Sequence, residues 1–139
     1  MRYTRLTDAH LEGLFELHRM YKADIGEEAP APADIESLRR AIEDGRISFF
    51  GAECDGKLVG CCSVCVAYST FNYAPAGVFE DFFILPEYRH RGIARELSNF
   101  AYRESGVRSM TVGCADCDVD MYRALGFDIP LGNLLSRTE

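Results

Sequence analysis

The chain has 139 residues, of which 47% are hydrophobic, and a net charge of −7 at pH 7. The hydrophobic content excludes a disordered protein, and the length fits one domain, residues 1–139, built around one core. The acidic balance argues against nucleic acid and membranes as partners and favours a cationic substrate. The sequence has no apolar run of about 18 residues and no basic start before an apolar segment, so we expect a cytoplasmic protein.

The first part of the chain predicts a strand followed by a helix. The strand covers residues 1–6. Thr7 or Asp8 can cap the helix, because both side chains accept hydrogen bonds from the free N–H groups of a first turn. One face of the helix is apolar and carries Leu11, Leu14, Phe15 and His18. We expect His18 to be a half-buried packing residue.

A loop and a second helix come next. Residues 23–32 contain Gly26 and two prolines, a composition that breaks regular structure. Asp34 is a suitable cap for the helix that follows, and Gly45 stands where a helix end favours glycine. The apolar face of this helix consists of Ile35, Leu38 and Ile42.

Three strands then form an expected antiparallel meander. Residues 46–54 and 57–68 are joined by Asp55-Gly56, a dipeptide typical of tight hairpin turns. Residues 68–77 include serine, asparagine, proline and glycine, and they predict a second connection. Residues 78–85 form the next strand.

A helix over residues 92–105 and a fifth strand over residues 109–114 complete the predicted elements. Because a helix separates the fourth and fifth strands, we expect them to be parallel neighbours joined by a right-handed crossover. The predicted fold class is therefore mixed α/β (α+β), with a central, mostly antiparallel sheet flanked by helices.

Six cysteines raise the question of a metal site. The pairs Cys62–Cys65 and Cys114–Cys117 have the C-x-x-C spacing of zinc sites. The first pair falls in a predicted strand, where residues three apart face opposite sides and do not converge on one ion. We therefore favour buried thiols over structural zinc and predict no metal, and a cytoplasmic location disfavours disulfides.

The segment 79–97 is the most informative part of the chain. An apolar strand ends at Pro86 and is followed by a glycine turn and then by apolar residues at helical spacing. The free N–H groups and the dipole of such a helix start favour a phosphate, and Gly92 lets the ligand approach the backbone. The turn carries the positive side chains of Arg89, His90, Arg91 and Arg95.

Two motifs resemble the GNAT superfamily of N-acetyltransferases. Arg89, Gly92 and Ala94 fit its coenzyme A signature, which is Arg or Gln, two residues, Gly, one residue, and Gly or Ala. Residues 121–127, Met-Tyr-Arg-Ala-Leu-Gly-Phe, are similar to a later block in which a tyrosine lies on a helix before Leu-Gly-Phe. The resemblance implies acetyl-CoA as cosubstrate, a small-molecule amine as acceptor, and a sheet splayed between strands four and five.

The resemblance also implies roles for individual residues. Main-chain groups of Phe83 and Ile84 are expected to bind the pantetheine arm at the splayed edge. Tyr122 is the expected general acid for the departing thiolate, and the alternative is a core tyrosine beside Phe127. The pyrophosphate is expected on the turn that includes Arg89, His90, Arg91, Gly92, Ile93, Ala94 and Arg95.

Glu80 is the candidate general base. It is adjacent to Asp81 on a predicted strand, so the two side chains are expected to face opposite sides and only one can address a given pocket. The alternative is that these acids are solvated or paired with basic residues. The sequence leaves open which of the two carboxylates acts as the base.

A narrower resemblance points to the diamine (spermidine/spermine) acetyltransferase branch. It rests on residues 68–71, Tyr-Ser-Thr-Phe, and 80–84, Glu-Asp-Phe-Phe-Ile, and it favours a polyamine or diamine acceptor. The chain departs from this branch at residues 116–118, and a last strand at residues 131–135 is expected to be incomplete or completed by a partner chain in a homodimer. We expect direct acetyl transfer to a primary amine in a ternary complex; a non-catalytic acyl-CoA sensor or assembly module is the alternative.

Overall fold

The computed structural model describes residues 1–139 and contains one five-stranded sheet. Its strands lie in the order β1-β2-β3-β4-β5. They are β1 (Arg2–Arg5), β2 (Ser48–Cys54), β3 (Lys57–Ser69), β4 (Ala74–Ile84) and β5 (Ser109–Thr111). The helices are α1 (Leu11–Asp24), α2 (Pro32–Glu43), α3 (Ile93–Glu104) and α4 (Val119–Ala124).

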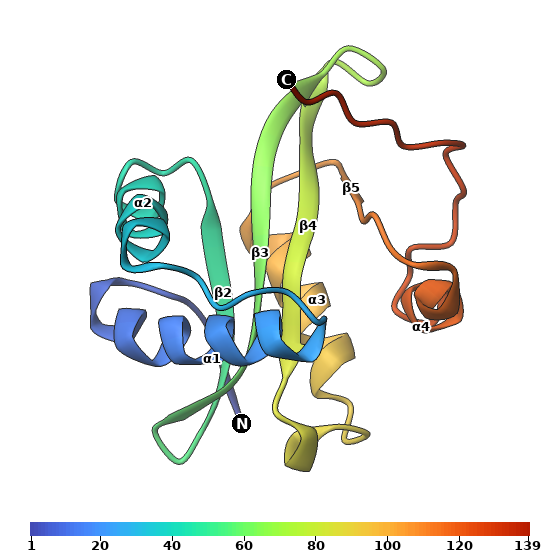
Figure 1. Ribbon diagram of the computed structural model, residues 1–139. Helices are drawn as coiled ribbons and strands as arrows, with labels where there is room; N and C mark the ends of the chain where they lie inside the picture. Colours follow the sequence, from blue (N-terminus) through green and yellow to red (C-terminus); the bar gives the residue numbers. More distant parts are fainter.

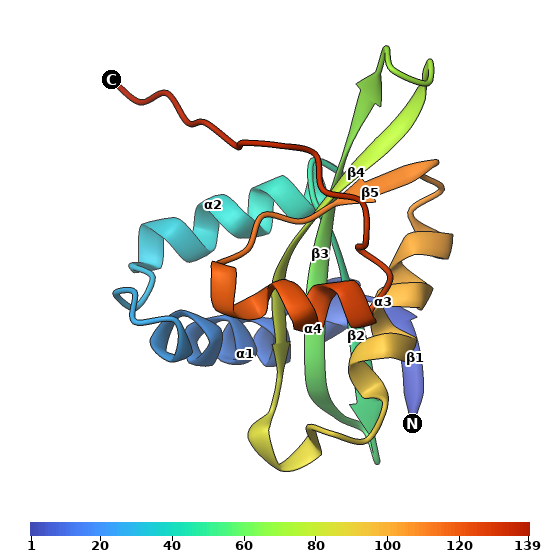
Figure 2. The same cartoon turned by 90° about the vertical axis from the view of Figure 1, so that its right-hand side faces the viewer.

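Helices cover both faces of this sheet. In Figure 1, α1 and α2 lie on the near side of the strands and α3 lies behind them; Figure 2 shows the same layers edge-on. The first four strands pair antiparallel, and β4 pairs with β5 in parallel. The predicted mixed, mostly antiparallel sheet is therefore confirmed.

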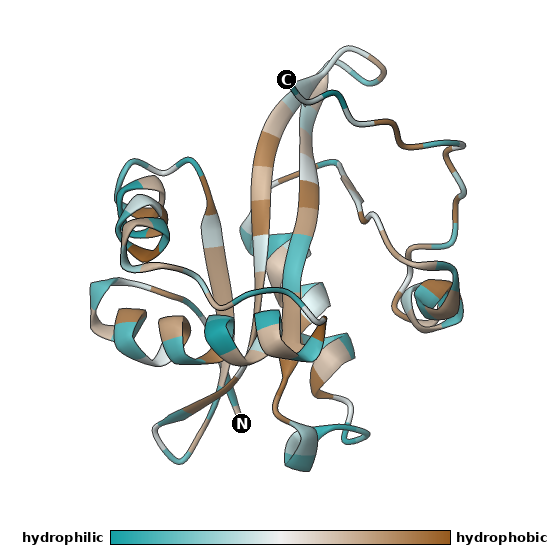
Figure 3. Ribbon diagram, in the orientation of Figure 1, coloured by the Kyte–Doolittle hydropathy of each residue, from teal (hydrophilic) through white to brown (hydrophobic).

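The core lies on both faces of β2, β3 and β4, where Figure 3 shows hydrophobic stretches along the strands. Neighbouring residues of a strand point to opposite faces, so Phe49 and Phe50 fill different layers although both are fully buried. Phe50 packs edge-on against Phe100 of α3, with ring centroids 6.1 Å apart. On the other layer α1 buries Leu14 completely. This packing fixes the strands against which the site is built.

The two hairpins differ in how well local sequence predicts them. Asp55 and Gly56 have φ angles of 51° and 78°, as a two-residue hairpin turn with positive φ at both positions requires. The second connection is much shorter than the expected 68–77, because β3 continues to Ser69 and β4 begins at Ala74. Pro75 pairs with Tyr68 inside this ribbon, so pairing across the strands outweighs the local turn residues.

The residues that precede α1 and α2 differ in part from the predicted helix caps. Thr7, not Asp8, precedes a single 3-10 turn (Asp8–His10) that leads into α1, and the Thr7 N–H donates to Nδ1 of His10. The expectation that Asp34 caps the second helix is wrong, because α2 begins at Pro32. Proline is favoured in the first helical turn, and the Asp34 carboxylate instead accepts a 2.8 Å hydrogen bond from the Ala31 N–H.

The C-terminal part contains less regular structure than expected. Strand β5 covers only Ser109–Thr111, and the expected last strand at residues 131–135 is absent. The side chains of Leu134 and Leu135 are 86% and 89% exposed, so this segment packs little against its own chain. No helix in the structure combines the length and apolar character that crossing a membrane requires.

Candidate functional site

Strand β4 contains a bulge at the point where the candidate base lies. Ser63 of β3 lies opposite Glu80, and Cys61 lies opposite Phe83. One residue of β3 therefore faces two residues of β4, Asp81 and Phe82, which is the count of a β-bulge. Asp81 has a φ of 54°, a left-handed conformation that is uncommon outside glycine.

The bulge places Glu80 and Asp81 on the same face of the sheet. Glu80 is cross-strand from Ser63, and residues directly opposite one another share a face. The Ser63 hydroxyl donates a 2.6 Å hydrogen bond to Oδ2 of Asp81, so this carboxylate lies on that face too. The expectation that the two acids face opposite sides is therefore wrong, because the extra residue interrupts the alternation of the strand.

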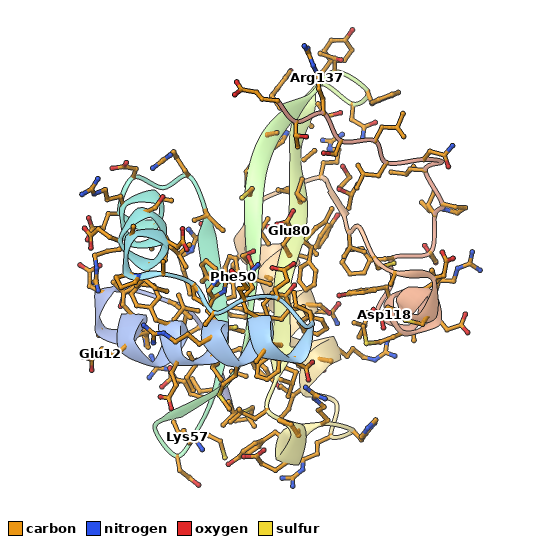
Figure 4. The ribbon with its side chains drawn as sticks, viewed as in Figure 1. Glu12, Phe50, Lys57, Glu80, Asp118 and Arg137 are labelled. Atoms are coloured by element: carbon orange, nitrogen blue, oxygen red, sulfur yellow. The ribbon has the colours of Figure 1, made fainter.

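The shared face of these acids is the one that α1 covers. The Tyr21 ring of α1 lies 6.4 Å from the Phe83 ring, and the His18 ring lies 6.2 Å from Tyr21. In Figure 4, Glu80 is labelled midway along β4, above the C-terminal half of α1. Neither Glu80 nor Asp81 has a basic group within ion-pair distance. The arrangement presents two carboxylates without cationic partners beside aromatic rings.

Titration of the α1 residues reflects this neighbourhood. Burial lowers the pKa of His18, while the Asp81 carboxylate acts in the opposite direction. Burial raises the pKa of Tyr21, and the Asp81 charge raises it further. Sequence reasoning predicted His18 correctly as half-buried but missed Tyr21. The available signal was that Tyr21 follows His18 by three residues and so shares its helix face.

Tyr122 of α4 lies beside the open edge of β4 (Figure 2), against Phe82 and Phe127. Its ring centroid is 6.3 Å from that of Phe82 and 5.8 Å from that of Phe127. Burial raises the Tyr122 pKa to about 12, and the nearby Tyr21 phenol is the next cause. The hydroxyl is therefore protonated at neutral pH, and none of the side-chain hydrogen bonds in the structure uses it. It is free to donate to a ligand.

The turn before α3 offers a run of free donors. None of the main-chain N–H groups from His90 to Arg95 has an acceptor within the chain. His90 and Gly92 have φ angles of 62° and 82°, and a Cβ added at Gly92 would meet no atom within 4 Å. The buried side chain of Ile93 fixes the first helical turn to the core. Successive free N–H groups at a helix start form an anion site.

Arg89 differs from its basic neighbours because the structure ties its side chain down. Its Nε–H donates to the Ile84 carbonyl at 2.8 Å, and its guanidinium lies 5.5 Å from the Phe83 ring. A second nitrogen is 3.8 Å from Oδ2 of Asp24, at the end of α1. His90, Arg91 and Arg95 are exposed. Arg89 thus anchors the turn to β4. The Arg91 guanidinium lies 5.3 Å from the Tyr88 ring, and neither His90 nor Arg95 has an ion-pair partner.

The edge of β4 is open next to this turn. Strand β4 pairs with β5 only at Ala76, Gly77 and Val78, so its second half has no partner on that side. The Leu85 N–H donates to β3 at Val59, and strand alternation therefore directs the main chain of Ile84 to the open edge and that of Phe83 to β3. The predicted splay between strands four and five is confirmed, and Ile84 lies at its edge.

The cysteines do not gather at one point. Cys62 lies opposite Phe50, on the α3 side, whereas Cys65 lies near Glu80 and Asp81, whose charges add to burial in raising its pKa. Cys61 and Cys62 are fully buried, and burial raises the pKa of both thiols. No group of three or more His, Cys, Asp or Glu side chains is placed to hold a metal ion.

An open mixed sheet with a free helix start at its edge is the architecture that the sequence resemblance implied for an acetyltransferase. Residues 45–129 match the family model described as Acetyltransferase (GNAT) domain. The match covers more than half of the chain, so the protein belongs to the GNAT acetyltransferase family. No curated protein matches the sequence.

Solved structures share the fold along the whole chain. A probable acetyltransferase is 20% identical, with a TM-score of 0.84 and 100% of both chains covered. AAC(6')-Iy, in complex with the bisubstrate analog CoA-S-monomethyl-acetylneamine, is 21% identical, with a TM-score of 0.82, covering 99% of this chain and 97% of that one. A predicted acetyltransferase with acetyl-CoA from Clostridium acetobutylicum is 14% identical, with a TM-score of 0.79 and coverages of 99% and 95%. At these identities the likeness concerns the fold.

Proposed function

We propose that the protein transfers the acetyl group of acetyl-CoA to a primary amine of a small cationic molecule, directly and in a ternary complex. Family membership makes acetyl-CoA the cosubstrate. The observation that carries the proposal is the run of unpaired N–H groups from His90 to Arg95, which lies next to the open edge of β4. A pyrophosphate suits such a run of donors, and an amide chain suits an open strand edge.

The coenzyme would lie along this edge. The pyrophosphate would accept hydrogen bonds from the turn, with the exposed side chains of Arg91 and Arg95 adding positive charge and His90 a ring nitrogen. The Ile84 N–H would donate to the pantetheine arm. Arg89 would hold the turn next to β4, because its side chain donates a hydrogen bond to the Ile84 carbonyl. The expectation that the Phe83 main chain binds the pantetheine arm is not kept, because that main chain faces β3.

Acetyl transfer then requires two proton movements. The neutral amine attacks the thioester carbon, a C–N bond forms, and the C–S bond breaks. Glu80 or Asp81 accepts the proton that the amine loses, and the Tyr122 hydroxyl donates to the departing thiolate. The free Tyr122 hydroxyl supports the second role, because it is protonated at neutral pH and no side-chain hydrogen bond within the chain uses it.

Two classes of amine are candidates for the acceptor. We favour a polyamine or diamine, as the diamine branch resemblance suggests, because Glu80 and Asp81 face the same side without cationic partners. An aminoglycoside is the second candidate, because acetyltransferases for such amines are among the structural neighbours. Both classes carry several ammonium groups and suit an acidic surface.

Thiol release from acetyl-CoA in the presence of an amine panel tests the proposal. The panel holds spermidine, putrescine, an aminoglycoside and a peptide with a free N-terminus, and mass spectrometry identifies the acetylated product. Release with a polyamine or an aminoglycoside supports an enzyme and ranks the two classes. Tight acetyl-CoA binding without release would instead favour a non-catalytic acyl-CoA sensor or assembly module. Three expectations from the sequence remain predictions. They are that the chain acts as a single domain, that it forms a homodimer and that it is located in the cytoplasm.

A further inference from the structure

The β4 bulge is held by two side chains of β3 rather than by regular ladder bonds. Between Cys61 and Ser63 the register of β3 and β4 shifts, and the ladder is interrupted there. The Cys61 thiol lies 3.7 Å from the Asp81 carbonyl oxygen, and the Ser63 hydroxyl donates to the Asp81 carboxylate at 2.6 Å. These two contacts replace the missing main-chain bonds at one residue, Asp81.

Ser63 is unusual among the residues of this core because it is a polar side chain with 1% of its surface exposed. A buried hydroxyl needs a partner, and its partner here is a charged group, for which hydrogen bonds are short and strong. Asp81 in turn has a φ of 54°, a conformation that persists only when its surroundings hold it. The hydrogen bond therefore fixes the rotamer of Asp81 and stabilises the strained backbone that carries Glu80.

We propose that Ser63 is a positioning residue for acetyl transfer, acting through Asp81 to keep both carboxylates of the bulge directed to the acceptor side of the sheet. This inference rests on the proposed function, because it assumes that an amine binds on the α1 face of β4. Ser63 is 1% exposed, so it would act through Asp81 and not on a substrate directly. Its effect is to hold the Asp81 carboxylate in one place and, through the bulge, to keep Glu80 on the same face.

A double-mutant cycle separates positioning from simple packing. Ser63→Ala removes the donor, Asp81→Ala removes both the charge and the acceptor, and the third variant carries both changes. We expect Ser63→Ala to lower kcat/KM for the amine by about tenfold, while KM for acetyl-CoA stays unchanged. Ser63→Ala should add no further loss in the Asp81→Ala background, where the hydroxyl has no carboxylate to hold. Ser63→Thr, which keeps the hydroxyl, should recover part of the lost activity.

A second readout does not require turnover, so failure of the proposed function can be told apart from failure of this inference. His18 faces Asp81 of β4 and also senses Arg19 and Lys22 of its own helix and Glu27 of the following loop. Loss of the Asp81 charge should lower the His18 pKa further, because the carboxylate favours the protonated ring. An NMR titration of the His18 ring, assigned with His18→Gln, should show a downward shift in Asp81→Asn and a smaller one in Ser63→Ala.

Two results would overturn the proposal. The first is an unchanged His18 titration in Ser63→Ala together with a downward shift in Asp81→Asn, which would mean that the carboxylate keeps its place without the hydroxyl. The second, in an active enzyme, is a loss from Ser63→Ala that multiplies with that of Asp81→Ala, as expected of a packing defect. If no amine is turned over but the His18 shifts appear in both variants, the positioning of Asp81 stands and the proposed function fails.

Discussion

Tyr122 of α4 packs against Phe82 of β4 across the open edge of the sheet, with ring centroids 6.3 Å apart. Phe82 is one of the two bulge residues, so the same irregularity that turns Glu80 and Asp81 toward α1 leaves an aromatic ring on the other face for Tyr122. One local feature, the bulge, therefore sets both the direction of the two candidate bases and the ring against which the proposed acid packs. This relationship predicts distinct defects when each group is removed.

Tyr122→Phe removes a hydroxyl and keeps the ring contacts with Phe82 and Phe127. We expect acetyl-CoA binding to persist while turnover falls by about 10²- to 10⁴-fold, the usual contribution of a positioned acid. Steady-state kinetics and a binding titration on the same preparation measure both quantities. Full activity with several amines at all pH values would show that Tyr122 is only a packing residue.

Glu80→Gln tests the base. A base matters most while the amine arrives protonated, so we expect the loss of activity below the pKa of the amine and a smaller deficit at higher pH. Asp81→Asn, measured in parallel, shows which of the two carboxylates accepts the proton. The pH profile of kcat/KM for each variant is the measurement. A deficit that is equal at every pH in both variants would exclude base catalysis by this pair.

The thiols should separate into reactive and protected groups. Burial raises the pKa of Cys61 and Cys62, so neither forms a thiolate at neutral pH, whereas Cys114 and Cys117 are exposed. A thiol reagent should modify Cys114 and Cys117 in the native protein and should reach Cys61 and Cys62 only after unfolding. Mass spectrometry of the labelled peptides reports the outcome, and rapid labelling of Cys62 in the native state would contradict the structure.

Zinc content gives an independent check on the same residues. Cys62 and Cys65 lie on opposite faces of β3, so they do not converge on one ion. Protein purified without chelator should carry far less than one zinc per chain, and its stability should not respond to a strong chelator. Stoichiometric zinc by elemental analysis would require a different structure for this strand.

Gly92→Glu should abolish acetyl-CoA binding without unfolding the protein. The φ of 82° makes any side chain at this position cost about 1 to 2 kcal/mol, and the added carboxylate would lie where the pyrophosphate is expected. Gly106→Glu is a matched control, because Gly106 follows the other end of α3, has a φ of 69° and also has open space around it. Equal loss of acetyl-CoA binding in both variants would contradict a site at Gly92.

Local chemistry made some features predictable. Asp55-Gly56 encodes its turn directly, and the sequence from Pro86 through Gly92 predicts both the strand end and the free helix start. The bulge was not predictable, because one extra residue in β4 is defined only by its pairing with Cys61 and Ser63 on β3. Pro75 by itself indicates a loop, but in the structure it pairs with Tyr68 of β3.

The candidate site was predictable to a similar extent. Arg89 fits the coenzyme signature by spacing, yet its side chain turns back to the Ile84 carbonyl, a contact that spacing does not reveal. Tyr21 enters the site because α1 packs across β4, and this depends on the tertiary fold. Sequence motifs thus predicted which segments form the site, while the direction of individual side chains required the structure.

Thermal unfolding with increasing acetyl-CoA tests the central claim most directly, namely that the helix start at Gly92 and the open edge of β4 bind the coenzyme. At one hundred times its dissociation constant, acetyl-CoA should stabilise the fold by about 2.7 kcal/mol, because it binds only the native state. Free acetate should have no effect, since it lacks the pyrophosphate and the pantetheine arm. No change in Tm up to millimolar acetyl-CoA would contradict the account.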